Sequence, residues 1–289
     1  MDKEVKIRIV RSDNKEFNID GNDWKITKLE GFGEFENDIN VVDKAVGDGG
    51  IITSSRIGTK DRTITAKSLN KYLNDVLRRE ADSFFNPKLT YKVYLTYMGI
   101  TRWAEGTIYK YKIPNDNIHR RMVLTVTFLF PNPYLKSYED FGEDIASITP
   151  MIGFPYICNV SAGRPYGVTG GIYNFARQVV LENDGAVETY CKAVFVAKGI
   201  VVNPALIIGE SYVRVLDTMI EGDVLEMDFT NSPPTVKKNG KNIIGKCDRK
   251  SSFDTMILNK GDTVIQFDAD DGTNVLQVSI YYNKLYSII

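Results

Sequence analysis

The chain has 289 residues, of which 43% are hydrophobic and 25% charged, and its 36 basic and 37 acidic side chains leave a formal net charge of -1. This composition excludes low-complexity disorder over most of the chain, and the length predicts two domains. The near-neutral charge excludes a long-range attraction to nucleic acid or to an anionic membrane, so we expect no specific nucleic-acid binding.

The first 135 residues predict a β-rich domain, of barrel or sandwich type, with one α-helix. Residues 5–9 alternate valine or isoleucine with lysine or arginine, which is the period of a half-buried strand. Further runs rich in β-branched and aromatic residues cover 24–29, 89–98, 101–113 and 120–130. Short connections between the last three predict an antiparallel meander, because crossover helices would need longer ones.

One amphipathic helix is predicted between these strands. Apolar residues recur at helical spacing at Leu69, Tyr72, Leu73, Val76 and Leu77. Ser68 suits the N-cap position, and Asn86-Pro87 closes the segment. We therefore expect this apolar face to pack against the surrounding sheet.

The segment 34–58 mixes apolar residues with flexible glycines and exceeds the ~12–15 residues of ordinary loops. An arm that adds strands to an adjacent protomer would satisfy both its backbone and its apolar side chains. We favour this intersubunit interpretation over an ordinary internal hairpin. The candidate arm residues are Ile39, Val41, Val42, Val46, Gly49, Gly50, Ile51 and Ile52.

Prolines mark a domain boundary after Phe130. The sequence PNPYLKS has two prolines in three residues, each of which removes a donor from a sheet. Residues 136–171 are rich in proline and glycine. We therefore predict an N-terminal domain at 1–135, a connecting segment at 136–171 and a C-terminal domain at 172–289.

The C-terminal domain is predicted to be a jelly-roll β-sandwich. Short runs typical of strands cover 177–183, 190–197, 200–208, 211–217, 224–229, 254–258, 263–267 and 275–282. Asn239-Gly240 is the strongest turn signal, because a type I′ hairpin needs positive φ at both central positions. About eight strands without intervening helices favour a sandwich.

Few side chains suit catalysis or metal binding. His119 is the only histidine, whereas Ser–His and Cys–His catalysis and the common metal sites need imidazole. The cysteines Cys158, Cys191 and Cys247 are too widely spaced for a zinc site or a disulfide framework. The acidic run 268–272 lacks the glycine and glutamate of an EF-hand loop, because Thr273 and Ser279 occupy those positions. We expect no catalytic residues, no metal and no cofactor.

The start, MDKEVKIRIV, does not resemble a signal peptide, and no run approaches the ~20 apolar residues of a membrane span. We therefore expect no membrane contact, and we expect the chain to be synthesised in the cytoplasm.

Several stretches together resemble the siphophage distal tail proteins. In the N-terminal half these are LEGFGEFENDINVVDKAVGDGG, RIGTKDRTITA, FNPKLTYKVYLTY and FLFPNPYLKS. In the C-terminal half they are VVLENDGAVETY, EGDVLEMDF, VKKNGKNI and LNKGDTVIQF. The order and spacing of these stretches carry the resemblance. Cys191 and Leu129 depart from residues common in such proteins.

The resemblance implies an N-terminal domain that assembles into a homohexameric ring and a galectin-like C-terminal sandwich. It implies a virion protein at the phage tail tip. Its partners would be the major tail tube protein on one side, and a tail-tip or tail-associated protein, the tape measure or a receptor-binding protein on the other. The alternative functions are a carbohydrate-binding module for host cell-wall recognition and a hydrolase.

Overall fold

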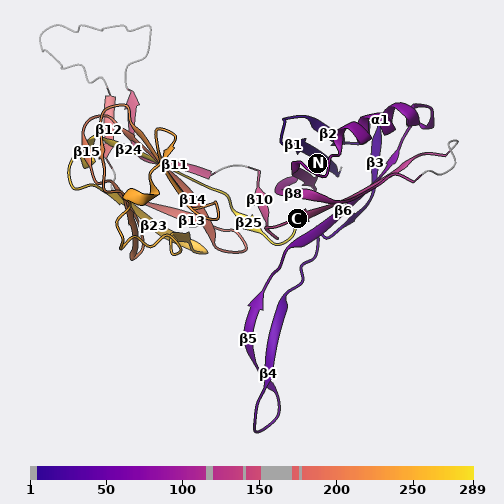
Figure 1. Ribbon diagram of the computed structural model, residues 1–289, viewed down its shortest axis with the longest axis horizontal. Helices are drawn as coiled ribbons and strands as arrows, with labels where there is room; N and C mark the ends of the chain where they lie inside the picture. The colour runs from indigo at the N-terminus through magenta and orange to yellow at the C-terminus, as the bar shows by residue number, and fades with distance from the viewer. Residues whose placement is uncertain (1–4, 115–119, 139–140, 151–170, 176–177) are drawn as a thin grey trace, which may run out of the picture. The chain divides into compact units, whose positions relative to one another are not determined.

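The computed structural model describes residues 5–114, 120–138, 141–150, 171–175 and 178–289 (Figure 1). The chain forms two compact units, with Met1–Tyr138 and Leu285–Ile289 in unit 1 and Glu139–Lys284 in unit 2. Most described residues lie in antiparallel strands, and the described part of the chain contains one α-helix, α1 (Asn74–Phe84). The predicted mainly-β fold is therefore confirmed. No described helix has the length and apolar character needed to cross a membrane.

Unit 1 is built on one nine-stranded sheet with the path β2-β1-β7-β8-β9-β6-β3, to which β10 and β25 are attached. The strands of this sheet are β1 (Lys6–Arg11), β2 (Glu16–Ile19), β3 (Trp24–Glu30), β6 (Lys60–Ser68), β7 (Thr90–Tyr97), β8 (Ile100–Lys112), β9 (Val123–Phe130), β10 (Leu135–Ser137) and β25 (Leu285–Tyr286). The predicted meander is confirmed as β7-β8-β9. The path is open, with β2 and β3 at its ends, so the described strands form a sheet and not a closed barrel.

The position of the helix corrects the sequence-based prediction. A short 3-10 turn, Lys71–Leu73, precedes α1, and Asn70 caps this turn by accepting a hydrogen bond from the Tyr72 N–H. The buried face of the helix is Leu77, Ala81 and Phe84. Tyr72 and Val76, which were expected in the core, are 80% and 51% exposed. Of the predicted apolar stripe, Leu77 is therefore buried, whereas Tyr72, Leu73 and Val76 lie outside the core.

The core of unit 1 is rich in aromatic rings. The ring of Phe17 lies 5.3 Å from that of Phe84 and 5.0 Å from that of Phe85. The Tyr91 hydroxyl accepts a hydrogen bond from the Asn86 N–H at 2.6 Å and lies 3.1 Å from the Phe84 carbonyl, to which it donates. These bonds fix the end of α1 on the sheet.

Unit 2 contains an eight-stranded sheet and a four-stranded sheet, with a two-stranded ribbon. The larger sheet comprises β12 (Gly171–Phe175), β11 (Phe141–Pro150), β24 (Leu276–Tyr282), β14 (Thr189–Ala197), β19 (Val224–Asp228), β20 (Thr235–Lys238), β21 (Lys241–Asn242) and β22 (Ile257–Leu258). The smaller sheet comprises β13 (Gln178–Asn183), β23 (Gly261–Asp268), β16 (Ala205–Ile208) and β17 (Ser211–Arg214). The ribbon is β15 (Val201–Val202) with β18 (Thr218–Met219), and two 3-10 turns lie at Ile244–Lys246 and Thr273–Val275.

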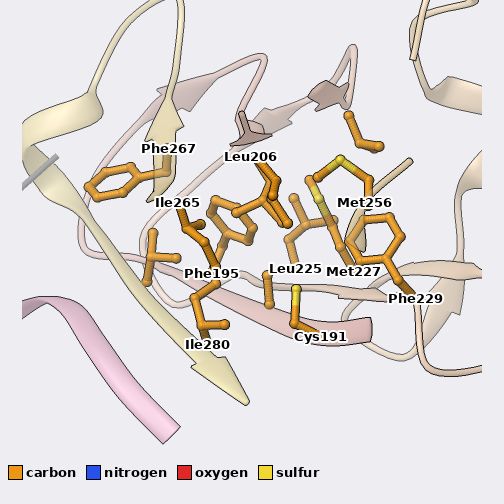
Figure 2. Close-up of a cluster of buried hydrophobic side chains, with 14 of the residues drawn as sticks. Cys191, Phe195, Leu206, Leu225, Met227, Phe229, Met256, Ile265, Phe267 and Ile280 are labelled. Atoms are coloured by element: carbon orange, nitrogen blue, oxygen red, sulfur yellow. The ribbon is translucent and has the colours of Figure 1, made fainter. Parts of the chain in front are cut away.

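The two sheets of unit 2 share one hydrophobic core, shown in Figure 2. Phe195 and Ile280 come from the larger sheet, and Leu206, Ile265 and Phe267 come from the smaller one. Each of these side chains is at most 1% exposed. Side chains of both sheets therefore pack into a sandwich, as predicted, while its likeness to galectins stays a prediction.

The segment predicted as a connection, residues 136–171, contains strands. In the larger sheet of unit 2, β11 pairs with both β12 and β24. Residues 151–170, and with them Cys158, lie outside the described residues. Leu285–Ile289 group with unit 1, because β25 pairs with β10. The limits 1–135, 136–171 and 172–289 stay a prediction.

Asn239 and Gly240 form the predicted hairpin turn between β20 and β21, with φ of 49° and 78°. The Asn239 amide donates to Asp223 at 2.8 Å, and the Ile220 N–H donates to the same carboxylate at 3.0 Å. The Lys238 ammonium lies 3.1 Å from this carboxylate. The bonds from Ile220, Asn239 and Lys238 lower the pKa of Asp223 to about 2.

This depressed pKa predicts an acid-sensitive contribution to stability. The carboxylate stabilises the folded chain fully above its unfolded pKa of about 4, and this stabilisation is lost as the pH falls toward 2. Asp223→Asn should lower the free energy of unfolding by about 1 kcal/mol at pH 7 and should flatten its decline between pH 4 and 2. Urea unfolding at several pH values measures both effects. The exposed control Asp254→Asn should keep the wild-type slope, and an equally steep slope for Asp223→Asn would refute the prediction.

Two glycines of unit 2 form a matched pair for a second prediction. Gly272 has a φ of 76°, and a Cβ added there would collide with the Ile200 carbonyl oxygen. Gly240 has a φ of 78° and no atom within 4 Å of an added Cβ. Gly240→Ala should cost about 1 kcal/mol, the usual penalty of a left-handed alanine. Gly272→Ala adds a backbone collision and should cost roughly 2–3 kcal/mol. Equal losses in urea unfolding would show that the collision relaxes freely.

Candidate assembly interface

Residues 34–58, called the arm below, form a free-standing hairpin in unit 1. Its strands β4 (Asp38–Asp43) and β5 (Gly50–Arg56) pair with each other in a separate two-stranded sheet. Figure 1 shows the hairpin projecting from the ends of β3 and β6. The Lys44 N–H donates to the Gly49 carbonyl at 3.1 Å and closes the hairpin loop.

The structure brings all eight candidate arm residues together on this hairpin. Its six apolar candidates are between 50% and 90% exposed, and Gly49 and Gly50 are exposed too. Val41 lies opposite Ile52, and Val42 lies opposite Ile51. Since successive side chains of a strand point to opposite faces, both faces of the hairpin carry an apolar pair. An internal hairpin would bury one such face, so this arrangement favours a partner outside the unit.

Polar contacts across the arm hold the hairpin without help from the core. The Asn40 amide donates to the Ser54 hydroxyl at 2.7 Å, and the Asn37 amide donates to the Ser55 hydroxyl at 2.8 Å. A side chain at Gly50 would collide with Val41. Local bonds thus shape the arm, while its apolar side chains remain uncovered by the described residues of unit 1.

Arg62, on β6, anchors the root of the arm. It is 1% exposed, and its guanidinium donates to the Gly31 carbonyl at 3.1 Å and to the Pro133 carbonyl at 2.6 Å. It lies 5.6 Å from the ring centroid of Phe32 and 4.9 Å from that of Phe130. Burial lowers the pKa of Arg62 to about 10, so the side chain stays charged at neutral pH. It therefore ties the chain entering the arm to the end of β9.

The sequence analysis did not identify Arg62 as a buried residue. Charged side chains in a strand such as KDRTITAKS are normally expected to face solvent. The alternation of Arg62, Ile64 and Ala66, all buried on one face of β6, was the available signal. Gly31 has a φ of 79° and lies against the Asp61 carbonyl, which leaves no room for a side chain beside Arg62.

Within the described ranges, no group of three or more His, Cys, Asp or Glu is placed to hold a metal ion. His119, the only histidine of the sequence, lies outside the described residues. Burial raises the pKa of the Cys191 thiol to about 12 and that of Cys247 to about 11. Neither thiol is therefore activated as a nucleophile at neutral pH. In the acidic run, Asp270 accepts a hydrogen bond from Asn203 at 2.7 Å and pairs with Arg214 at 3.4 Å.

Comparison with known proteins gives three findings. Residues 184–286 match the family model of the siphovirus-type tail component, C-terminal domain. The fold is similar to the crystal structure of the Dit protein of phage SPP1, described as a paradigm of the hub adsorption apparatus in phages infecting Gram-positive bacteria. The TM-score is 0.66 at 11% identity, covering 96% of this chain and 98% of that chain. No curated protein sequence matches the chain.

Chains from the phage P2 baseplate in its activated conformation are similar as well. With calcium the TM-score is 0.60, and with strontium it is 0.59, each at 10% identity and covering 99% of this chain and 100% of that chain. The resemblance to siphophage distal tail proteins is therefore confirmed, because residues 184–286 match the C-terminal domain of that tail component and nearly the whole chain shares the fold of the SPP1 Dit protein.

Proposed function

We propose that the protein is a structural component of the virion, a distal tail protein whose N-terminal unit closes into a homohexameric ring at the phage tail tip. The ring would join the major tail tube protein to the tail-tip or tail-associated protein, the tape measure or the receptor-binding protein. Tail and baseplate proteins that share the fold support this proposal.

The main observation that supports a ring is the exposed arm. Its apolar side chains lie on both faces of a hairpin that no other described strand pairs with. Burying exposed apolar surface yields about 25 cal/mol per Å², so an arm covered by a neighbour stabilises the assembly. Closed cyclic rings use one surface of each protomer against a different surface of the next. The arm supplies one of these two surfaces.

We also propose that the protein is not an enzyme. Its support is the single histidine of the sequence and the unreactive thiols of Cys191 and Cys247. The proposed localisation is the phage tail tip, after synthesis in the host cytoplasm. The carbohydrate-binding alternative for the C-terminal sandwich stays a prediction without a supporting site in the described part of unit 2.

The test is the molar mass of the purified full-length chain, measured by light scattering over a range of concentrations. A ring predicts about six times the chain mass of 32.6 kDa. A chain that stays monomeric at the highest concentration would contradict a ring that closes without tail partners.

A further inference from the structure

A basic groove lies at the far end of unit 1 from the arm. Its volume is about 770 Å³, and it is lined by the last residues of β6, the 3-10 turn before α1, the start of α1 and the start of β9. Its charged lining consists of Lys67, Lys71, Asp75, Arg78, Arg120 and Arg121. We call it the α1 groove. It holds five basic side chains and one acid, a net charge of +4.

The basic charges of the groove are largely uncompensated. The one acid, Asp75, already bonds Arg79 at 2.7 Å, and this bond lowers its pKa. Arg78 lies 4.0 Å from Asp82. Lys67, Lys71, Arg120 and Arg121 are exposed and form no ion pair with a described residue. The groove therefore presents a positive surface to an incoming partner.

Apolar side chains accompany these charges. Tyr72 lines the groove, Leu73 belongs to the same 3-10 turn and Val76 to the first turn of α1, and all three are exposed. This is the stripe whose amphipathic pattern predicted burial. The isolated chain leaves it in water, so a partner that carries both apolar and acidic side chains fits this surface.

The arm has that composition. Its acids are Glu34, Glu36, Asp38, Asp43 and Asp48, and its basic residues are Lys44 and Arg56, a net charge of -3. Its apolar candidates are at least half exposed. The arm is therefore negatively charged where the groove is positively charged. Both surfaces also expose apolar side chains to solvent. Complementary potentials of this kind steer association and select the partner.

The arm points away from the groove of its own chain (Figure 1). The arm joins β6 at Lys60, whereas the groove begins at Lys67, seven residues further along the strand or about 23 Å away. Figure 1 shows the hairpin pointing away from α1. The two complementary surfaces therefore lie at opposite ends of unit 1, which suits the head-to-tail contacts of a closed ring.

The free edges of the sheet are less suitable receivers. Edge strand β3 has a register shift between Ile26 and Lys28 and carries the exposed Lys25 and Lys28. The other edge, β2, has only four residues. Bulges, lysines and short length are the features that protect sheet edges from strand addition.

We propose that the α1 groove is the docking site for the arm of a second copy of this chain. Arg120, Arg121 and Lys71 face the carboxylates of the incoming hairpin, and Tyr72 and Val76 cover its apolar side chains. This inference rests on the proposed function, in which the arm joins protomers.

Charge reversal tests the docking site in the full-length protein at low salt. The groove variant is Arg120→Glu with Arg121→Glu, the arm variant is Glu36→Lys with Asp38→Lys, and the third variant combines all four changes. Sedimentation velocity should show self-association at least about tenfold weaker for the groove variant and for the arm variant. The combined variant should return to within about threefold of the wild type, because the reversed charges attract again.

A matched control reverses an exposed basic pair of unit 2, Lys237→Glu with Lys241→Glu, and should associate like the wild type. Wild-type association of the groove variant, while deletion of the arm abolishes assembly, would overturn the docking site and leave the proposed role of the arm intact. Wild-type association of both the groove variant and the arm deletion would overturn the arm's role as well. Failure of the combined variant to recover would overturn the charge pairing, and a chain that is monomeric under all conditions would overturn docking between free copies.

Discussion

Deleting Asp43–Ser54 is expected to give a folded chain that cannot form the proposed hexamer. The deletion removes Val46, Ile51 and Ile52, which are three of the six apolar candidates of the arm, and no residue of either hydrophobic core. Ile39 remains opposite Ser55, so Asn40–Val42 can close a shortened hairpin. Light scattering should therefore report a monomer, while the midpoint of thermal unfolding should stay near that of the wild type. Hexamers of normal mass would show that the arm is dispensable.

Point variants separate the apolar contribution of the arm from its length. Val42 and Ile51 form a cross-strand pair on one face, so Val42→Ser with Ile51→Ser keeps the hairpin but removes apolar contact. We expect assembly to weaken by a factor of ten or more, since each buried aliphatic side chain contributes about 1.5–3 kcal/mol. The matched control is Val180→Ser with Val264→Ser, an exposed cross-strand pair in unit 2. If the control pair weakened assembly equally, the apolar side chains of the arm would have no specific role in assembly.

Replacing Phe195 with alanine is expected to cause the largest loss of stability of any single change considered. Phe195 lies on β14 at the centre of the core of unit 2, with no exposed surface, and meets side chains of both sheets (Figure 2). Truncating a buried phenylalanine costs about 3–5 kcal/mol, from lost transfer energy and the cavity left behind. Exposed Ile220→Ala is the control and should change stability by at most about 0.5 kcal/mol.

The two tryptophans make this measurement specific to one unit. Trp24 and Trp103 both lie in unit 1, so their fluorescence follows the unfolding of unit 1, whereas circular dichroism follows both units. Phe195→Ala should move the dichroism transition to lower denaturant and leave the fluorescence transition in place. Equal shifts of both transitions would show that the two units unfold together.

The sequence alone was sufficient where the signal is local. An alternating pattern located β1, because a strand with one buried face repeats every two residues, and runs typical of strands located β7, β14 and β24. Asn239-Gly240 fixed a hairpin, because few other residues adopt positive φ at both positions. The mixture of glycine and β-branched residues also singled out the segment 34–58, which forms the hairpin β4-β5, while its intersubunit role stays a prediction.

Contacts between distant residues decided the rest. The sheet of unit 1 stays open because β2 and β3 do not pair with each other. No local sequence pattern predicts whether these two strands pair. Of the predicted stripe, the helix buries only Leu77, and it buries Ala81 and Phe84 instead of Tyr72 and Val76, because packing against the sheet selects the face. Arg62 is buried because two carbonyls and two rings from other segments converge on it. Strand patterns are set by neighbours along the chain, whereas pairing partners, helix rotation and buried charges depend on residues that only folding brings together.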